Sequence, residues 1–445
     1  ACTNKEIYDI TIGGPGPWTP QPGLGTFTTD YWTWRNYQNA SGNFLIAANN
    51  GGGYVAYGGG GFSDGFSNGF RTEASGFIRI TEGDTPGKVS GVNPDLFCYV
   101  MVFKQRLWFI EKNSSRAWYL PTQQLTGEAH QFDFGPLFRH GGHLVALVNW
   151  TLDGGEGIDD YLVAIGSEGD VVIFKGYDPD QAAEDPNAFA LHGVWYVGAL
   201  PEGFRSVDPY GGDVYILSMR GLTALSMLVS DRLGVESMGQ ISDKIDPFIT
   251  QLLRNSNRSS SWYVKLLPSQ EFIIIGVPQV VTRAGVGQLT YTINQPAWHR
   301  FADLPVAHFT SHDALTFAGG DSSRSIDAGG KVYLMFENSV DNVAPAEESV
   351  TPDTIRCRIV PAFNSFGSPG LWKNYPMIRP SWLADQVPGL TVRILTDYAL
   401  PTAYSSPSLP AATQSLWDES LWDVGKWSGP PPAIRKWLAT VGGGY

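Results

Sequence analysis

The chain has 445 residues and a mass of 48.5 kDa, and 15 Trp within an aromatic content of 13% supply a large core. Gly and Pro, with 52 and 30 residues, exceed their usual shares of ~7% and ~5%, but together they stay below the ~25–30% that signals disorder. No run of ~18 apolar residues occurs, which argues against a membrane-spanning helix, and a formal charge of −13 without a Lys/Arg-rich segment argues against tight binding of nucleic-acid phosphates.

The N-terminal residues differ in composition from the middle of the chain. A Gly/Pro-rich stretch runs from Gly13 to Gly25, and the aromatic residues Phe27, Tyr31, Trp32, Trp34 and Tyr37 follow it. We expect residues 1–43 to form an N-terminal extension that takes part in docking.

The middle of the chain repeats one plan, in which short apolar, β-branched and aromatic runs alternate with Gly, Asp, Asn and Ser turns. The central runs begin near Phe44, Tyr99, Tyr161, Val214, Phe272 and Ala314. A propeller blade places four strands in ~40–50 residues, so this spacing predicts an all-β chain with a β-propeller of five to seven blades over residues 44–344. Consecutive β-sandwiches are the alternative, but reuse of one hairpin plan favours the propeller.

One segment of the middle region has helical periodicity. Apolar residues recur on one helix face at Ile245, Phe248, Ile249, Leu252 and Leu253. Ser242 precedes them and is an expected N-cap. We therefore predict one short inserted helix that packs its apolar stripe on a sheet edge.

The C-terminal part becomes rich in Pro and Glu from about Asn342, and β-like runs follow at 355–360 and 390–398. We expect residues 345–445 to form, together with residues 1–43, a second β-rich region that docks on a partner. Trp417, Trp422 and Trp427 recur at intervals of five, which fits neither helix nor strand. They are candidate interface residues, and core anchoring is the alternative.

Four acidic residues in a Gly-rich loop are the strongest candidates for chemistry: Asp153, Glu156, Asp159 and Asp160. Such residues can bond turn amides, bind calcium or flank a glycosidic bond. Neighbouring residues of a strand point to opposite faces, so Asp159 and Asp160 cannot address one substrate together. We expect these acids to bond turn amides. The loop from Asp321 to Asp327 resembles a calcium loop only faintly, since it lacks the Gly and the final Glu of an EF-hand.

The remaining metal and catalytic signals are weak. His140 and His143 stand three apart without a third zinc ligand, and Cys2, Cys98 and Cys357 are widely spaced. His299, His308 and His312 have no partnered nucleophile in the sequence. No GxSxG, Walker A or dinucleotide-binding motif occurs. We therefore expect no catalytic residue, no cofactor and no metal.

A string of motifs in residues 106–179 resembles the tail nozzle, or packaged-DNA-stabilisation, proteins of short-tailed bacteriophages (the podovirus tail hub). The motifs occur in this order: Arg106-Leu107-Trp108-Phe109, Ala117-Trp118-Tyr119-Leu120-Pro121, Phe132-Asp133-Phe134-Gly135, Gly141-Gly142-His143-Leu144, Asn149-Trp150-Thr151, Asp159-Asp160-Tyr161-Leu162-Val163, Ser167-Glu168-Gly169-Asp170-Val171 and Lys175-Gly176-Tyr177-Asp178-Pro179. The resemblance covers the stretch from Leu107 to Leu228, with the rest of the chain similar in style, and the closing Trp-rich segment also resembles these proteins.

The resemblance implies a virion tail protein that forms the distal DNA conduit, retains the packaged genome and releases it on host attachment. It also implies a β-propeller assembled as a ring of six copies below an adaptor ring, and no enzyme activity. Tail fibres or a tail needle are candidate further partners. Genomic DNA would pass through the channel without tight binding, because like charges reduce sticking.

A glycan-binding or glycan-cleaving propeller is the alternative function. In that case Trp195 and Trp298 would stack on sugars, with Asp159 or Asp160 as the acid. A ring of six copies favours the conduit, whereas a single copy with sugar affinity favours the alternative.

Overall fold

The structure is a computed structural model. It describes residues 2, 6–8, 20–21, 23–27, 29–40, 42–58, 76–85, 87–153, 158–230, 240–256, 262–278, 287–294, 296–301, 304–312, 314–320, 330–336, 340–341, 353–354, 357–360, 364–368, 371–379, 381–383, 390–392, 394–395, 408–409, 433–435, 438–439 and 443–444. The chain divides into two compact units, residues 1–354 and residues 355–445.

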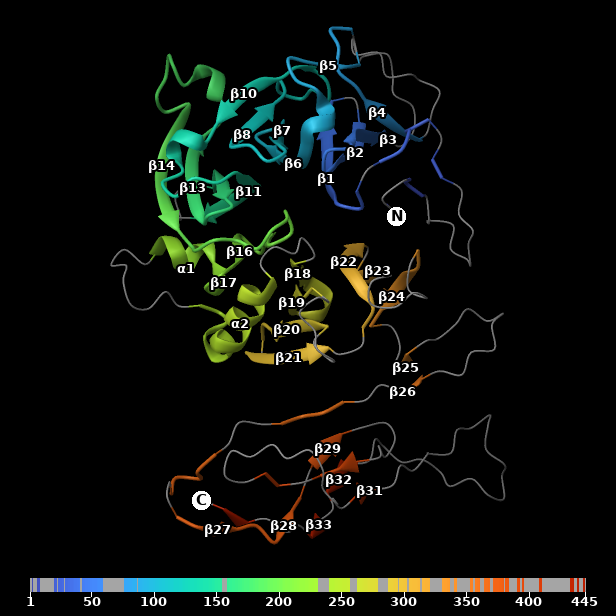
Figure 1. The fold of residues 1–445 in the computed structure, drawn as a ribbon, viewed down its shortest axis with the longest axis vertical. Coiled ribbons are helices and arrows are strands. Elements are labelled where there is room, and N and C mark those ends of the chain that lie inside the picture. The colour runs from blue at the N-terminus through green and yellow to red at the C-terminus, as the bar shows by residue number, and fades with distance from the viewer. Residues whose placement is uncertain are drawn as a thin grey trace. The chain divides into compact units, whose positions relative to one another are not determined.

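The described residues of the first unit form six antiparallel sheets of three or four strands, in which pairing follows the chain order except that a short strand of another pair, Gly127–Glu128, lies in the chain between two paired strands of the second sheet (Figure 1). The strands of the first three sheets are β1 (Trp32–Asn39), β2 (Gly42–Asn49), β3 (Gly53–Gly58) and β4 (Gly76–Ile80); β6 (Phe97–Phe103), β7 (Arg106–Glu111), β8 (Arg116–Tyr119) and β10 (His130–Asp133); and β11 (Leu144–Asp153), β12 (Ile158–Gly166), β13 (Asp170–Gly176) and β14 (Phe189–Tyr196). The strands of the other three are β15 (Val207–Tyr210), β16 (Asp213–Ser218) and β17 (Gly221–Ala224); β18 (Tyr263–Leu267), β19 (Phe272–Gly276), β20 (Gln288–Thr292) and β21 (Ala297–Phe301); and β22 (Val306–His312), β23 (Leu315–Gly320) and β24 (Val332–Met335).

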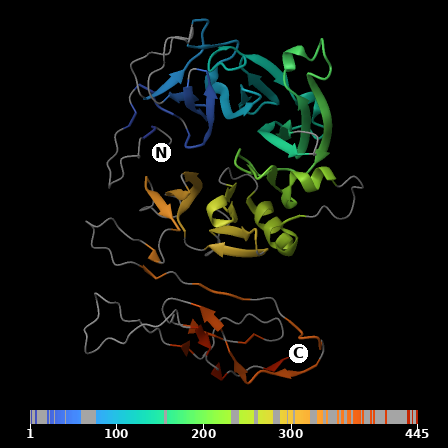
Figure 2. The same ribbon diagram turned by 180° about the vertical axis from the view of Figure 1, so that it is seen from behind.

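The first strand of each sheet lies on the inside. β1 contacts β6, β6 contacts β11, β11 contacts β15, β15 contacts β18, and β18 contacts β22. Figures 1 and 2 show the six sheets arranged in turn around a common centre. The fold is therefore a six-bladed β-propeller, which confirms the predicted fold class and rejects consecutive sandwiches.

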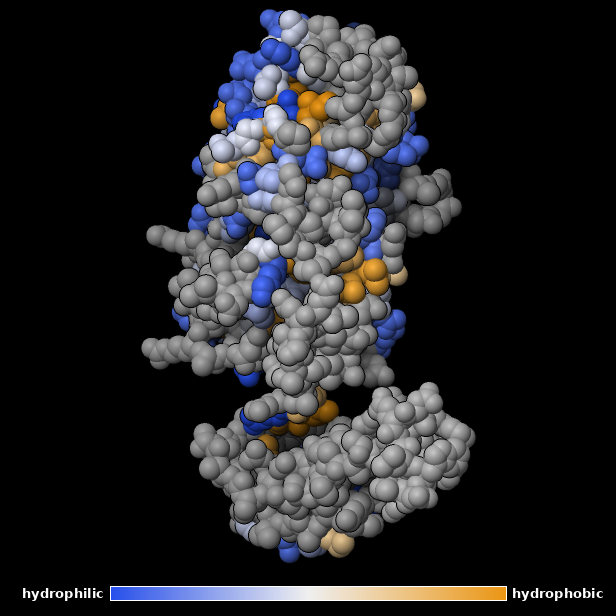
Figure 3. All heavy atoms as spheres, turned by 90° about the vertical axis from the view of Figure 1, so that its right-hand side faces the viewer, coloured by the Kyte–Doolittle hydropathy of each residue, from blue (hydrophilic) through white to orange (hydrophobic). Residues whose placement is uncertain are grey.

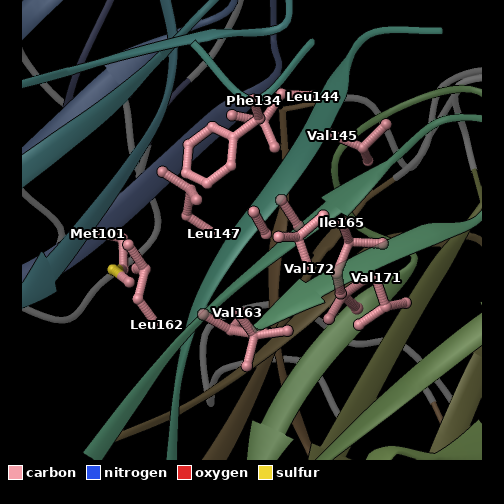
Figure 4. Packing of buried hydrophobic residues seen from close by; sticks show 14 of the residues in the cluster. Met101, Phe134, Leu144, Val145, Leu147, Leu162, Val163, Ile165, Val171 and Val172 are labelled. Atoms are coloured by element: carbon pink, nitrogen blue, oxygen red, sulfur yellow. The ribbon is translucent and has the colours of Figure 1, made fainter. Parts of the chain in front are cut away.

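The largest hydrophobic core lies between the second and third sheets and extends to the fourth (Figure 4). The strands that the third sheet contributes to this core carry uninterrupted apolar runs rather than alternating ones. The stretches Leu144–Val148, Leu162–Ile165 and Val171–Ile173 are all buried. An uninterrupted apolar run is typical of a strand covered on both faces, which is what packing between two blades provides.

The N-terminal residues belong to the propeller unit. Ile7, Leu24 and Phe27 pack with Trp32 and Val55 of the first sheet. The first blade begins at Trp32, inside the expected extension 1–43, because the aromatic cluster supplies its inner strand. This differs from our expectation that the two chain ends would form one region.

The described residues contain two short α-helices, α1 (Leu225–Ser230) and α2 (Asp246–Ser256). The predicted stripe buries Ile249, Leu252 and Leu253 against the fourth and fifth sheets, but Phe248 is 39% exposed. Ser242 does not cap the helix, because its hydroxyl accepts a hydrogen bond from the Leu222 amide at 3.0 Å. Five 3-10 turns are also present: η1 (Pro94–Leu96), η2 (Gly135–Leu137), η3 (Pro179–Gln181), η4 (Asp243–Ile245) and η5 (Pro268–Gln270).

Two further strand pairs complete the first unit: β5 (Val89–Ser90) with β9 (Gly127–Glu128), and β25 (Val340–Asp341) with β26 (Asp353–Thr354). The second unit contains four antiparallel pairs: β27 (Lys373–Asn374) with β34 (Gly443–Gly444), β28 (Met377–Ile378) with β33 (Leu438–Ala439), β29 (Ser381–Leu383) with β32 (Ala433–Arg435), and β30 (Leu390–Thr391) with β31 (Ser408–Leu409). The unit boundary follows Thr354, ten residues after the expected end of the propeller at 344. Within the residues listed above as described, no helix has the length and hydrophobicity to cross a membrane.

Candidate functional site

Charged and aromatic side chains gather where the inner strands of five sheets approach one another. We call this group the central cluster, and it consists of Tyr31, Arg35, Tyr99, Arg205, Asp208, Tyr263, Lys265 and His308. These residues lie on or next to β1, β6, β15, β18 and β22. A propeller brings them together because the first strand of every blade faces the same centre.

Arg35 connects the first and second sheets within the central cluster. Its Nη2 donates to the Tyr99 hydroxyl at 3.2 Å, and its Nη1 donates to the carbonyl of Trp34 at 2.8 Å. The guanidinium carbon lies 5.7 Å from the centre of the Tyr99 ring. Arg35 thus holds β1 beside β6 by a hydrogen bond and a cation–π contact.

Arg205 connects the fourth sheet with the segment that precedes the first. Its guanidinium carbon lies 4.8 Å from the centre of the Tyr31 ring, and its Nη2 donates to the Asp30 carbonyl at 3.4 Å. Its own carbonyl accepts a hydrogen bond from the Val264 amide at 2.7 Å. Burial lowers the pKa of Arg205, but an arginine stays charged at neutral pH.

Asp208 and Lys265 connect the fourth and fifth sheets. The Lys265 Nζ lies 3.0 Å from the Asp208 Oδ1, and the other carboxylate oxygen accepts the Leu266 amide at 2.8 Å. The carboxylate therefore satisfies both a side chain and a backbone donor of β18.

His308 adds the sixth sheet to the central cluster. Its ring stands perpendicular to the Tyr263 ring at 5.1 Å between centres, and its buried Nδ1 has no hydrogen-bond partner among the described residues. Burial, followed by the positive charges of Arg205 and Lys265, lowers the pKa of His308 well below 6.5. The imidazole is therefore neutral at pH 7.

The central cluster brings three cationic side chains against one carboxylate. It can link five sheets around the centre and present positive charge to an anionic group. Its described residues include no Ser or Cys nucleophile hydrogen-bonded to a base, which covalent catalysis would require.

A second polar network joins the second and third sheets. Arg106, which opens β7, forms ion pairs with Asp178 at 2.8 Å and with Asp180 at 3.0 Å. The Tyr119 hydroxyl donates to Asp180 at 2.6 Å, and the His130 Nδ1 lies 3.2 Å from the same carboxylate oxygen. Burial acts to raise the pKa of Asp180, but the bonds from Tyr119 and Arg106 outweigh it and hold the pKa below its ordinary value.

An open cleft of about 450 Å³ lies beside this network. Its lining residues are Lys104, Asp160, Lys175, Gly176, Tyr177, Asn187 and Ala190. Lys104 is placed there by the tight β6–β7 turn, in which Lys104 and Gln105 both have positive φ. This volume is within the range of small-molecule sites, and the lining supplies charged, amide and aromatic groups.

The acidic loop is only partly within the described residues. Asp160 accepts hydrogen bonds from Lys104 at 2.7 Å and from the Thr151 hydroxyl at 3.0 Å, so its partners are side chains and not the turn amides that we expected. Burial acts to raise the pKa of Asp160, but these two partners hold it below its ordinary value. Asp159 and Asp160 are consecutive in β12, as the argument about opposite faces requires. Glu156 and the side chains of Asp153 and Asp159 lie outside the described residues, as does the loop 321–329.

The two histidines of the Gly-Gly motif have different hydrogen-bond partners in the structure. The His140 Nδ1 lies 2.8 Å from the Asp170 Oδ1, and the His140 amide donates to the Asp170 Oδ2 at 2.8 Å. Asp170 is buried at the start of β13, so this pair holds the segment before β11 against the start of β13. The His143 amide donates to the Ser167 Oγ at 3.1 Å, and burial lowers the pKa of the His143 ring. Within the part of the chain that the structure describes, no group of three or more metal-ligating side chains occurs.

The tryptophans proposed as sugar platforms pack on their own sheets. The Trp195 ring covers Gly193 on β14, and Trp298 on β21 packs against Tyr291 at 5.1 Å between ring centres. Neither lines the cleft, where Tyr177 is the exposed aromatic residue. Trp417, Trp422 and Trp427 lie outside the described residues, so their interface role stays a prediction.

Sequence reasoning missed the central cluster and the partners of Arg106. Arg205 and His308 come from loops and strands that are far apart in the chain, and no local motif connects them. Arg106 and Asp178 were both present in the motif string, at its first and last elements, which was a usable signal for a contact.

No protein-family model matches the chain, and no curated protein matches it either. Among solved structures, a complex of the fission yeast SREBP-SCAP binding domains overlaps with a TM-score of 0.32 and 11% identity over 64% of this chain and 67% of that one. The Cps50 (Swd1) β-propeller domain of Myceliophteria thermophila overlaps with a TM-score of 0.36 and 12% identity over 71% and 85% of the two chains. The SapL1 lectin in complex with alpha methyl fucoside gives 0.30 and 10% over 69% and 93%. The propeller assignment therefore stands on the strand order and contacts of the chain itself.

Proposed function

We propose that this chain is a structural protein of a bacteriophage tail, the nozzle that forms the distal DNA conduit. In this proposal six copies form a ring in the virion tail below an adaptor ring, retain the packaged genome and release it on host attachment. The chain has no catalytic role in the proposal, and tail fibres or a tail needle are further partners.

The observation that carries the proposal is the spatial coherence of the motif string. The motifs from Arg106 to Pro179 occupy most strands of two consecutive blades, from β7 through β13. The first motif is bonded to the last by the ion pair between Arg106 and Asp178. Motifs that are weak one by one thus belong to one packed block, which supports the resemblance that they carry.

Charge also favours a conduit. Six copies of a chain with a formal charge of −13 carry −78, and a negatively charged wall lets DNA move with little sticking. Tight binding would need basic surfaces, whereas the chain has 43 Asp and Glu against 30 Lys and Arg.

The test is a cryo-electron microscopy map of the phage particle in which the chain is traced. We expect six copies around the tail axis, and a purified assembly of about 290 kDa, which is six times 48.5 kDa. Copies scattered away from the tail axis, or absence of the chain from the particle, would overturn the proposal.

The cleft favours glycan binding as the second candidate function. Sugars are bound by stacking on an aromatic face and by hydrogen bonds, and the cleft offers Tyr177, Asn187 and Lys104. Among the described lining residues Asp160 is the single carboxylate, whereas hydrolysis needs two carboxyl groups, so the described lining favours binding over cleavage. A glycan array with the intact chain and with Tyr177→Ala tests this. Retention of sugars that the variant loses would support it, and no retained sugar would reject it.

A further inference from the structure

A short segment of the C-terminal unit exposes many large apolar side chains. We call it the apolar segment and define it by Ile359, Val360, Phe366, Leu371, Trp372 and Met377, whose exposed fractions run from 45% to 68%. The described residues of this unit, in the lower part of Figure 3, show hydrophobic spheres beside hydrophilic ones. Soluble proteins expose such groupings mainly where another molecule covers them.

The stretch that contains the apolar segment is basic. Residues 355–384 contain Arg356, Arg358, Lys373 and Arg379 and no Asp or Glu. Residues 355–445 as a whole carry eight Lys or Arg and five Asp or Glu, a formal charge of +3, which leaves −16 for residues 1–354. The two units of the chain therefore have opposite charge.

The strands next to the apolar segment are short of partners within the described residues. β27 and β28, which include Lys373 and Met377, each pair with one strand, β34 and β33, over two residues. Two-stranded ladders are marginally stable in water, and their open edges and faces accept further partners. Among the described residues, the segment thus combines exposed apolar side chains, a basic surrounding stretch and strands that each pair with one other strand.

We infer that the apolar segment docks on the acidic propeller of a second copy of this chain. The inference deepens the proposed function and rests on its self-assembling ring. Opposite charges on the two units provide the attraction and orientation, and burial of the apolar side chains provides the affinity. A contact between two different surfaces is head-to-tail, and such contacts close into a ring when the rotation is suitable.

The propeller of a second copy fits better than nucleic acid. Phosphate binding favours clusters of Lys and Arg, whereas the four cations of residues 355–384 are spread among the six large apolar side chains of this segment. An acidic protein surface that also offers apolar side chains can pair with the cations and cover the exposed apolar side chains at the same time. Nucleic acid is kept as an outcome of the test.

The experiment compares the full chain with the double variant Ile359→Glu/Leu371→Glu by sedimentation velocity over a range of concentrations. Both side chains are more than 60% exposed, so the variant should fold. We expect its self-association constant to fall by about 100-fold or more, because two apolar contacts are replaced by charges that the acidic propeller repels. Leu371→Met is the matched control and should associate like the unaltered chain.

A second measurement locates the contact. Equal amounts of 14N- and 15N-labelled full chain are mixed and treated with a zero-length reagent that joins amines to carboxylates. We expect mixed-isotope links between Lys373 and Asp or Glu of residues 1–354. Links found only within single copies would overturn the inference.

The other outcomes are equally decisive. A chain that stays single at every concentration, or a double variant that assembles like the unaltered chain, overturns the inference. Binding of a 30-nucleotide single-stranded DNA that the variant loses, without self-association, assigns the segment to nucleic acid instead. If the six-copy tail ring forms even with the double substitution, the proposed function stands and the docking inference is wrong. If the double variant loses self-association but the chain is absent from the phage tail, the docking inference stands and the proposed function is wrong.

Discussion

Trp108 and Trp372 each follow a leucine in the sequence, yet Trp108 is fully buried in the second sheet and Trp372 is 61% exposed beside β27. Trp108 packs on Tyr119 within its own sheet and on Phe189 of the third sheet. Similar side chains thus build a core inside the propeller and an uncovered surface in the C-terminal unit. The difference teaches that four-stranded blades bury their apolar faces against each other, whereas the described two-stranded ladders of the C-terminal unit leave large apolar side chains exposed.

The comparison is tested most strongly by removing the two tryptophans in turn. Trp108→Ala should lower the free energy of unfolding by about 3–5 kcal/mol, since it leaves a cavity between two blades. Trp372→Ala should change it by less than about 0.5 kcal/mol, as surface substitutions usually do. Urea unfolding followed by tryptophan fluorescence and circular dichroism measures both. Equal losses would mean that the C-terminal unit has a core of its own.

The contribution of the contact between the second and third sheets to stability is tested by the substitution Arg106→Met. The Arg106 side chain is 9% exposed and pairs with Asp178 and Asp180, so removal leaves two carboxylates without their cation. We expect a loss of about 3 kcal/mol, the lower end for breaking a buried pair, because Asp180 keeps Tyr119 and partial hydration. Lys104→Met is the control and should cost less than about 1 kcal/mol. Similar costs for the two variants would show that the Arg106 network is not needed to join the blades.

The propeller centre should make stability depend on pH through His308. Its folded pKa lies well below 6.5, so below pH 6.5 the unfolded chain binds a proton that the folded chain excludes. Stability should therefore fall with decreasing pH by about 1.4 kcal/mol per unit until the folded pKa is reached. Chemical unfolding of the intact chain at pH 7 and pH 5 measures the difference.

His308→Gln should abolish this part of the pH dependence. His299→Gln, which alters an exposed residue of β21, should leave it in place. If His308→Gln kept the full slope, the buried imidazole would not be its source.

A smaller effect than that of Arg106→Met is expected at the surface of the same propeller. Asp160→Asn removes an ion pair whose side chains are 26% and 33% exposed, so it should cost less than about 1 kcal/mol. Urea midpoints of the variant and the intact chain check this. A loss near that of Arg106→Met would mean that Lys104 and Asp160 also join the two blades.

Much of the propeller followed from local sequence. The runs Leu144–Val148 and Val171–Ile173 became buried strands, and the turn residues between them became hairpins. Each blade is defined by its own contiguous residues, so a periodic pattern is enough to predict it. The first blade was placed too late in the chain because Trp32–Asn39 was assigned to an extension by its aromatic composition.

Contacts between distant residues were decided by the tertiary structure. Arg106 meets Asp178, and Arg205 meets Tyr31, because blades pack side by side around one centre. Side-chain pairing of this kind depends on sheet twist and on which face each strand turns inward, and neither is written in a local pattern. The local sequence predicted the strands of a β-propeller of five to seven blades, whereas the packing decided that there are six blades and a polar centre, because charges far apart in the chain become neighbours when the circle of blades forms.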